Sequence, residues 1–263
     1  MEQIIYKPRH IDKNFISGLL IKVCEKEEYL KDFIDGKLYM NTNFQFSQIE
    51  AKECMSNGQY DDYEGTQVVL NPTEDIECVM DFSDGVGKIM QGKRGELKHN
   101  GHTVWNVKLG RGKNIENIFC MYSIWFDLEN NLTTEIDDKI VEEFGDYCAV
   151  ILNKEEFINR VKRAVDKLEY TIKNELRYGY VDYVEIDGAY TELWTFRKRK
   201  SYQYQSEFRI AIGVNRQPEP LVLDIGSLSD IVVIGNAKTI LSTRVEDNSI
   251  IMGESRIPVM IKK

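Results

Sequence analysis

Apolar and polar residues alternate along several short segments of the chain, and this period of two predicts β-strands. Residues 19–23 form a short β-prone run, and residues 37–46 alternate so that Tyr39 and Asn41 share a polar face. Residues 118–126 are apolar on both faces, which predicts a strand in the middle of a sheet. Further strands are expected at residues 147–152, 180–186, 202–212, 221–225, 231–235 and 257–261.

Two other segments repeat apolar residues at helical spacing. The first covers residues 25–34 and is followed by Gly36, a residue type that commonly ends a helix. The second begins after Asn153, which is expected to be the N-cap because Glu156 follows three residues later. Its apolar stripe consists of Phe157, Ile158, Val161 and Val165. Helices and strands in this order predict an α+β fold with a mixed, mainly antiparallel β core and a few helices.

The region from residue 68 to residue 117 differs from its surroundings, because glycine-rich turns separate its short β-prone pieces. Such a pattern is typical of hairpins. His99 and His102 flank an Asn-Gly turn there, and we interpret them as exposed hairpin residues rather than metal ligands. We therefore expect a single α+β domain over residues 1–263, in which residues 68–117 could form a β-rich insertion.

Charge and cysteine content narrow the classes of function. A net charge of -9 argues against a general surface for nucleic acid or anionic membranes, since such a surface needs a positive field. The five cysteines are scattered, so neither a disulfide framework nor a cysteine-rich metal site is indicated, and a reducing cytoplasm fits best. No segment approaches the roughly 20 apolar residues that span a bilayer, and the N-terminus lacks the apolar region of a signal peptide. We expect a cytoplasmic protein without membrane contact.

The densest polar chemistry surrounds one predicted strand. Alternation over residues 202–212 would place Glu207 between Gln205 and Arg209 on one strand face. A carboxylate held beside a guanidinium and a carboxamide is either a structural ion pair or the acceptor of a binding or catalytic site, and the residues alone leave both open. Four bases, residues 197–200, precede the strand and form either a solvated strand entrance or a local basic patch.

Other motifs for chemistry are weaker. No Gly-x-Ser-x-Gly motif is present, and the Gly-x-Gly pairs lack the flanking strand and helix that a phosphate-binding loop requires. Asp61, Asp62 and Glu64 offer the oxygen ligands that magnesium or calcium prefers, but their spacing does not match an EF-hand. We predict no metal site.

Several of these residues together resemble a known group of proteins. The strand from Gly36 to Asn41, the acidic residues 62–65 and a later set are similar to a family of uncharacterised bacterial and phage proteins, largely described as a domain of unknown function. The later set comprises Phe196, Lys198, Tyr202, Gln205, Glu207 and Arg209. The resemblance covers the first 65 residues and roughly residues 195–235.

The order of elements is also similar to the core of ADP-ribosyltransferases, particularly the small bacterial toxins that modify DNA or RNA. That resemblance implies NAD as co-substrate, with Lys22 near the first polar position, Tyr39 stacked on nicotinamide and Glu207 as the catalytic glutamate. Breaking the nicotinamide–ribose bond builds positive charge on the ribose, which an ionised carboxylate stabilises. The resemblance also implies that Gln205 orients the acceptor. The other residues expected at NAD are Asn41, Tyr202 and Arg209.

Three functions are consistent with the sequence. The first is an intracellular ADP-ribosyltransferase-like enzyme that acts on NAD with Glu207 as its essential acid, and whose nucleotide or macromolecular acceptor is not identified. The second is a non-enzymatic phage or defence-system protein that binds a host protein or a nucleotide through the face rich in tyrosine and glutamine. The third is a metal-dependent nuclease that uses Asp62, Glu64 and Glu207. The oligomeric state stays open.

Overall fold

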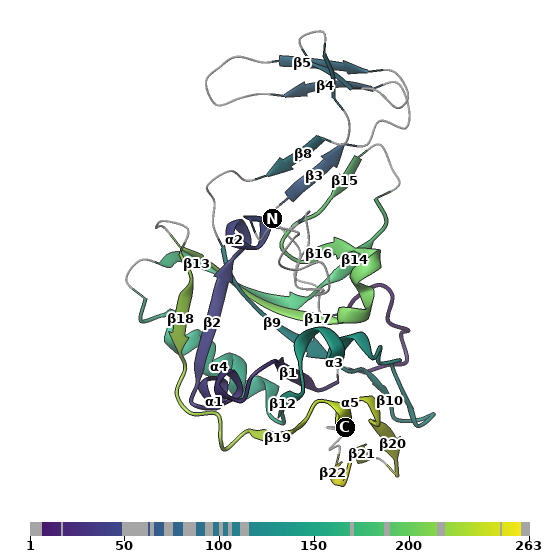
Figure 1. The fold of residues 1–263 in the computed structure, drawn as a ribbon, viewed down its shortest axis with the longest axis vertical. Coiled ribbons are helices and arrows are strands. Elements are labelled where there is room, and N and C mark those ends of the chain that lie inside the picture. Colours follow the sequence, from purple (N-terminus) through teal and green to yellow (C-terminus); the bar gives the residue numbers. More distant parts are fainter. Residues whose placement is uncertain are drawn as a thin grey trace.

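The chain folds around one large β-sheet (Figure 1). The sheet has eight strands, and every pairing within it is antiparallel. A few helices and several small sheets accompany it, so the predicted α+β class with a mainly antiparallel core is confirmed. The computed structural model describes residues 7–16, 18–48, 63, 66–70, 76–80, 88–92, 97–99, 102–104, 107–110, 116–168, 171–186, 190–214, 219–247 and 249–258.

The elements are as follows. The strands of the main sheet are β1 (Leu20–Cys24), β2 (Lys37–Thr42), β9 (Glu116–Ser123), β12 (Tyr147–Ile151), β13 (Thr171–Tyr180), β17 (Glu207–Val214), β18 (Leu221–Asp224) and β19 (Val232–Asn236). The helices are α1 (Glu27–Ile34), α2 (Asn43–Gln48), α3 (Lys139–Phe144), α4 (Lys154–Val165), α5 (Lys238–Leu241) and the 3₁₀-helix η1 (Lys200–Gln205).

Strand β9 is the point at which the sheet forks. One edge of β9 pairs with β17. The other edge pairs first with β2, where Ile118 faces Asn41, and then with β1, where Tyr122 faces Ile21. Strands β12 and β19 extend the sheet beyond β1, β18 lies beyond β2, and β13 lies beyond β17. β9 is buried along nearly its whole length, as its apolar sequence predicts.

Several small sheets lie outside the main sheet. Strands between residues 66 and 110 form one of them alone and a second together with a strand at residues 190–192, and both lie above the main sheet in Figure 1. In one hairpin His99 pairs with His102, as the Asn-Gly turn predicts. The strands are β3 (Thr66–Leu70), β8 (Val107–Gly110) and β15 (Tyr190–Glu192); β4 (Ile76–Met80), β5 (Lys88–Gly92), β6 (Leu97–His99) and β7 (His102–Val104); β10 (Phe126–Asp127) and β11 (Leu132–Thr133); the parallel pair β14 (Asp182–Val184) and β16 (Arg197–Arg199); and β20 (Arg244–Glu246), β21 (Ser249–Met252) and β22 (Ser255–Pro258).

The two faces of the main sheet bury separate clusters of apolar side chains. The first face includes Phe119 and Phe208, and it packs against apolar residues of α1 and α4. The second face includes Tyr122 and packs against apolar residues of α3 and α5. Because successive side chains of a strand point to opposite faces, Phe208 on the first face places Glu207 and Arg209 on the second.

The strand predicted over residues 37–46 is wrong in its second half. β2 ends at Thr42, and α2 begins at Asn43. The Thr42 hydroxyl oxygen accepts a hydrogen bond from the backbone N–H of Gln45 at 3.0 Å, the contact by which a threonine caps a helix. This local hydrogen bond outweighs the apolar alternation, which continues through the helix.

The strand predicted over residues 202–212 is also wrong at its start. Residues up to Gln205 form η1, and β17 begins at Glu207. Between them, Ser206 has a left-handed backbone with φ 38°. Its hydroxyl donates to the Ser123 carbonyl at 2.8 Å, and the Ser123 hydroxyl donates to the Ser206 carbonyl at 2.7 Å. These contacts with β9 fix the break, and a distant partner of this kind is absent from the local pattern.

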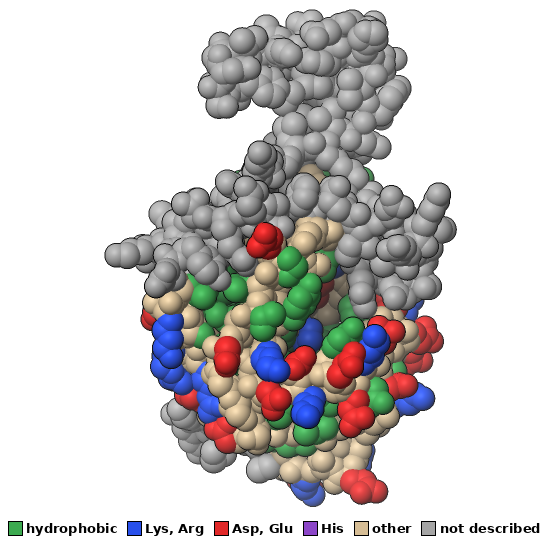
Figure 2. All heavy atoms as spheres, turned by 60° about the vertical axis from the view of Figure 1, so that its left-hand side comes forward, with side chains coloured by type: hydrophobic (Ala, Val, Ile, Leu, Met, Phe, Trp, Pro, Cys, Tyr) green, Lys and Arg blue, Asp and Glu red, His purple; other side chains and the backbone are tan. Residues whose placement is uncertain are grey.

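Charge is distributed without a large field of one sign on the visible surface. On the face shown in Figure 2, lysine and arginine side chains alternate with aspartate and glutamate side chains. Recognition of an anion therefore requires a local cluster of bases rather than the overall charge.

None of the helices within the described residues combines the length and the apolar composition of a membrane span.

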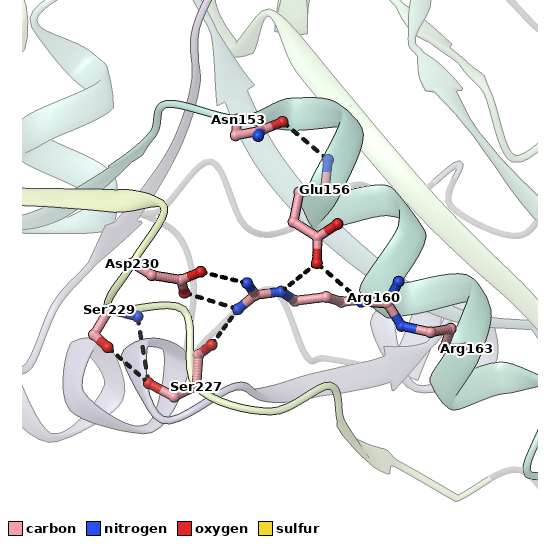
Figure 3. A network of polar contacts seen from close by, with 7 residues as sticks. All are labelled: Asn153, Glu156, Arg160, Arg163, Ser227, Ser229 and Asp230. Carbon is pink, nitrogen blue, oxygen red and sulfur yellow. Dashed lines mark hydrogen bonds and ion pairs between the residues drawn. The ribbon is translucent and has the colours of Figure 1, made fainter.

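Helix α4 has a polar cap at its start, and one arginine in its middle joins it to the segment between β18 and β19. Asn153 caps the helix by accepting from the Glu156 N–H at 3.0 Å, as predicted. Arg160 then donates to Glu156 at 2.9 Å and to both carboxylate oxygens of Asp230, and it also donates to the Ser227 carbonyl (Figure 3). One guanidinium thus bonds to its own helix and to the β18–β19 segment.

The same segment lies directly against the turn after α1. The Ile225 N–H donates to the Gly36 carbonyl at 2.9 Å. Gly36 has φ 89°, and a Cβ atom added there would lie 2.0 Å from the Gly226 carbonyl oxygen. Only glycine fits this turn, because both the backbone conformation and the close approach exclude a side chain.

Gly36→Ala should therefore destabilise the fold strongly. The left-handed backbone alone costs a residue with a side chain about 1–2 kcal/mol, and the clash with Gly226 adds to it. Urea unfolding measures the loss. Gly235→Ala is the control, since its added Cβ would meet its nearest atom at 3.5 Å, an ordinary contact. Equal losses in the two variants would contradict this account of the turn.

Candidate functional site

Glu207 is the centre of a buried ionic cluster on the second face of the sheet. One carboxylate oxygen accepts from the Lys198 ammonium at 2.7 Å, and the other accepts from the Arg209 guanidinium at 2.7 Å. The side chains of Glu207, Lys198 and Arg209 are 9%, 7% and 3% exposed. Of the two interpretations that the sequence leaves open, the structural ion pair is thus formed, and we call these three residues the Glu207 triad.

The local sequence explains why Lys198 points inward. β16 pairs in parallel with β14, and its middle residue is the buried one of the three. Phe196, two residues earlier, is buried as well. η1 then turns the chain back, so that the Gln205 side-chain oxygen accepts from the Lys198 ammonium at 2.6 Å. The backbone N–H of Glu207 donates to the Tyr183 hydroxyl on β14 at 2.9 Å.

A second buried carboxylate extends the polar region along the same face. Glu116 on β9 accepts from the Arg177 guanidinium on β13 and from the Thr195 hydroxyl. The Arg209 guanidinium donates to the Thr195 carbonyl at 2.6 Å. Thr195 therefore links the Glu207 triad to the Glu116–Arg177 pair across three adjacent strands.

The electrostatics of the cluster keep Glu207 ionised. Burial alone would raise the pKa of Glu207, but the charges and hydrogen bonds of Arg209 and Lys198 together hold that pKa well below its usual range. Burial raises the pKa of Tyr183 well above its usual value, so its phenol stays protonated. The two cationic neighbours thus favour the ionised form of the Glu207 carboxylate.

Four residues predicted from the sequence meet at this cluster. Glu207 and Arg209 belong to the triad, and Gln205 accepts from Lys198. Tyr202 lies in η1, where the Lys198 ammonium is 4.7 Å from its ring centroid and the Arg199 guanidinium 5.2 Å. The structure thus brings Tyr202, Gln205, Glu207 and Arg209 together, although a helix and a strand hold them rather than one strand.

Lys22 is not brought to the cluster. Its ammonium donates to the Cys120 carbonyl at 3.2 Å and lies 4.5 Å from the ring centroid of Phe119. Phe119 belongs to the first face of the sheet, whereas Glu207 lies on the second. Lys22 and Glu207 are therefore on opposite faces, and a single ligand on the second face does not reach both.

Tyr39 and Asn41 share the second face with Glu207 but lie apart from it. Asn41 pairs with Ile118, and Ile118 pairs with Ala211, four residues along β17 from Glu207. Four residues of a strand span about 13 Å. The Asn41 side-chain oxygen accepts from the backbone N–H of Thr42 at 2.9 Å, and Tyr39 is 60% exposed.

Sequence reasoning missed several members of the cluster. Lys198 is among the residues of the family resemblance but was not expected to pair with Glu207, and Glu116, Arg177 and Tyr183 were not singled out. A signal for Lys198 exists in the sequence, because its spacing of two from Phe196 places both side chains on one strand face. The Glu116–Arg177 pair joins strands far apart in the chain, so no local pattern indicates it.

The described residues do not test the hypothesis of a metal-dependent nuclease. Among the described residues, no three histidine, cysteine, aspartate or glutamate side chains lie together as a metal site would require. Asp61, Asp62 and Glu64 lie outside the described residues. The nuclease hypothesis, which joins Asp62 and Glu64 to Glu207, stays a prediction.

Comparisons with known proteins add no relative. No family model, no curated protein and no solved structure matches this chain. The resemblances to the bacterial and phage family and to ADP-ribosyltransferases therefore stay predictions.

Glu207→Gln tests the role of the triad in stability. The substitution removes the carboxylate between two buried cations, and loss of one partner of a buried ion pair costs about 3–5 kcal/mol. Urea unfolding at pH 7 measures this. Glu246→Gln is a matched control, because Glu246 also pairs with an arginine two residues away at 2.7 Å but is exposed. It should leave the unfolding midpoint nearly unchanged.

The pH dependence of the folding stability follows from the same carboxylate. Because the pKa of Glu207 is depressed in the folded protein, this group contributes stability above the unfolded-state pKa of about 4.3. The contribution is lost as the pH falls toward the folded-state pKa. The difference in stability between the wild type and Glu207→Gln should therefore narrow below about pH 4. A difference that stays constant between pH 7 and pH 3 would show that the charge of Glu207 contributes nothing.

Proposed function

We propose that the protein binds an anionic ligand of the nucleotide class beside β16 and η1, with Glu207 as part of the supporting structure rather than as a catalytic acid. The observation that supports this most is the Glu207 triad itself. Two cations and one carboxylate together have a formal charge of +1, and they lie directly beneath η1.

The sign of this charge favours an anion. A catalytic glutamate of an NAD-dependent transferase must face the positive charge that develops on the ribose. Both oxygens of Glu207 accept from cations at 2.7 Å, so its negative charge is already compensated. A cationic transition state near the triad would meet net repulsion, whereas a phosphate would meet net attraction.

Aromatic rings and cations are interleaved at this place. The Tyr202 and Tyr204 rings are stacked with centroids 6.5 Å apart, and the Lys139 ammonium lies 5.1 Å from the Tyr204 centroid. The Arg199 guanidinium lies 4.4 Å from the ring centroid of Tyr63. Side chains of this kind hold phosphates by charge and bases by stacking.

One exposed and one half-buried base near the rings could contact the ligand. Lys200 is exposed and pairs with Glu185 at 2.8 Å. An exposed ion pair contributes little stability, so a ligand phosphate can replace Glu185 at low cost. Arg197, three residues earlier, is half-buried on β16.

One observation favours the NAD-dependent transferase as the second candidate. Ser206 has φ 38°, a conformation that residues other than glycine rarely adopt, and it directly precedes Glu207. Strained backbone is concentrated at functional sites. The Gln205–Glu207 segment therefore has one feature of a catalytic loop, although the compensated charge of Glu207 argues against the chemistry.

Calorimetric titration with ADP-ribose tests the binding proposal. We expect binding that weakens as salt is added, and the double variant Arg197→Ser/Lys200→Ser should weaken it about tenfold or more, since each lost charged contact is worth about 1 kcal/mol or more. Lys26→Ser/Lys37→Ser removes two exposed lysines, one directly before α1 and one at the start of β2, and should leave the affinity unchanged.

Incubation with NAD separates the two candidates. The binding proposal predicts no release of nicotinamide. Release that disappears in Glu207→Gln, with the variant shown to be folded by circular dichroism, would establish NAD cleavage that depends on Glu207 and overturn a purely structural role of this residue. Absence of binding by ADP-ribose, NAD and ATP alike would overturn the binding proposal.

A further inference from the structure

A separate cavity lies on the other side of the main sheet, between α4 and strands β13 and β17. Its volume is about 340 Å³, within the lower part of the range typical of small-molecule sites. Three aromatic rings line it, those of Tyr178, Tyr180 and Phe208. Its charged lining residues come from the helix and are two lysines, Lys154 and Lys162, and one glutamate, Glu155. The cavity is thus a different place from the Glu207 triad, because Phe208 lies on the first face and Glu207 on the second.

Strand alternation produces the aromatic side of the cavity. Tyr178 and Tyr180 are two residues apart on β13 and therefore share a face. Tyr180 pairs directly with Phe208 on β17, and their rings meet edge to face with centroids 5.1 Å apart. Tyr178 approaches the same phenylalanine at 6.5 Å. Tyr180 and Phe208 are each 3% exposed, so the half-buried Tyr178 supplies most of the aromatic surface that a ligand could reach.

Helical spacing produces the charged side. Lys154, Ile158 and Lys162 follow one another at intervals of four residues, so they form one stripe along α4. The two lysines are eight residues apart, which separates their Cα atoms by about 12 Å along the helix. Ile158, between them, is buried and lines the cavity.

The two ammonium groups lie close to the aromatic rings. Lys154 donates to the Tyr180 hydroxyl at 3.2 Å, and its ammonium is 5.6 Å from the Tyr180 ring centroid. The Lys162 ammonium is 5.4 Å from the ring centroid of Tyr178. Lysine stems that cover aromatic rings would explain these contacts without a ligand. The hollow that the same residues line is a separate observation.

We propose that this cavity binds a small molecule in which a flat aromatic ring bears a phosphate or carboxylate group. The ring would lie against the half-buried Tyr178 ring, and the anionic group would bind the exposed Lys162 ammonium, which lies 5.4 Å from the Tyr178 centroid. Asn159, between the two lysines on the helix, lines the cavity with a carboxamide that both donates and accepts hydrogen bonds.

The size of the cavity limits the ligand. A volume of about 340 Å³ suits a molecule of one or two rings rather than an extended chain or a protein surface. The combination of apolar rings with charged groups at the edge also requires both parts of the ligand at once. A phosphate alone lacks the apolar contact, and a neutral ring alone lacks the ion pair.

Titration with 1-naphthyl phosphate, followed by calorimetry, tests the proposal. We expect saturable binding, with affinity at least about tenfold weaker for 1-naphthol and for inorganic phosphate, each of which has one part only. Lys162→Met removes the charge but keeps an apolar stem, and it should weaken 1-naphthyl phosphate about tenfold. Lys162 is exposed on the helix, so the variant should fold normally.

Lys167→Met is the matched control, because Lys167 follows the same helix but lines a different hollow beside Gly226. Its affinity for 1-naphthyl phosphate should equal that of the wild type. The double variant Arg197→Ser/Lys200→Ser should also bind 1-naphthyl phosphate with wild-type affinity. If the same double variant binds ADP-ribose more weakly, the two sites are distinct. Absence of binding, or binding unchanged in Lys162→Met, would overturn the proposal.

Discussion

The position of Glu207 between Lys198 and Arg209 is the interaction on which the polar side of the main sheet depends. Three ionised groups can be buried together only if their charges and hydrogen bonds compensate the loss of water. Lys198 comes from β16, whereas Glu207 and Arg209 come from β17, so the triad joins the small parallel pair to the main sheet. The position of η1, between these two strands, follows from that junction.

The same interaction decides how the candidate functions compare. A carboxylate that bonds to two cations and lies within the packed chain is poorly placed to stabilise a developing positive charge. Its compensated charge instead makes the surrounding bases the dominant feature. The opposite placement of Lys22, on the face that holds the aromatic cavity, has a similar effect, because an NAD site built from Lys22 and Glu207 would have to pass through the sheet.

Much of the fold follows from local patterns. The helix after Asn153 is predictable because its cap, its length and its apolar stripe lie within one short segment, and β9 is predictable because only a central strand is apolar on both faces. The triad is predictable in part: Glu207 and Arg209 share a face by spacing alone. The break at Ser206 is not, since its hydrogen bonds go to Ser123, more than 80 residues away along the chain.

The cavity between α4 and strands β13 and β17 is also only partly predictable from the sequence. The lysine spacing on α4 and the tyrosine spacing on β13 are both visible in the sequence. Nothing in either segment indicates that the helix crosses over those two tyrosines, because the packing of α4 on the sheet is a property of the whole fold.

The strict separation of the two faces of β17 has a consequence for folding. Glu207 and Arg209 face Tyr122 and Cys120, while Phe208 between them faces Met121. If β17 slipped by one residue against β9, Phe208 would enter the ionic layer, and the two charged side chains would be pressed among aromatic rings without their counterions. Misaligned pairing of these strands therefore has two energetic costs, the burial of charges without partners and the loss of apolar packing. The sequence of β17 alone thus favours the correct register during assembly of the sheet.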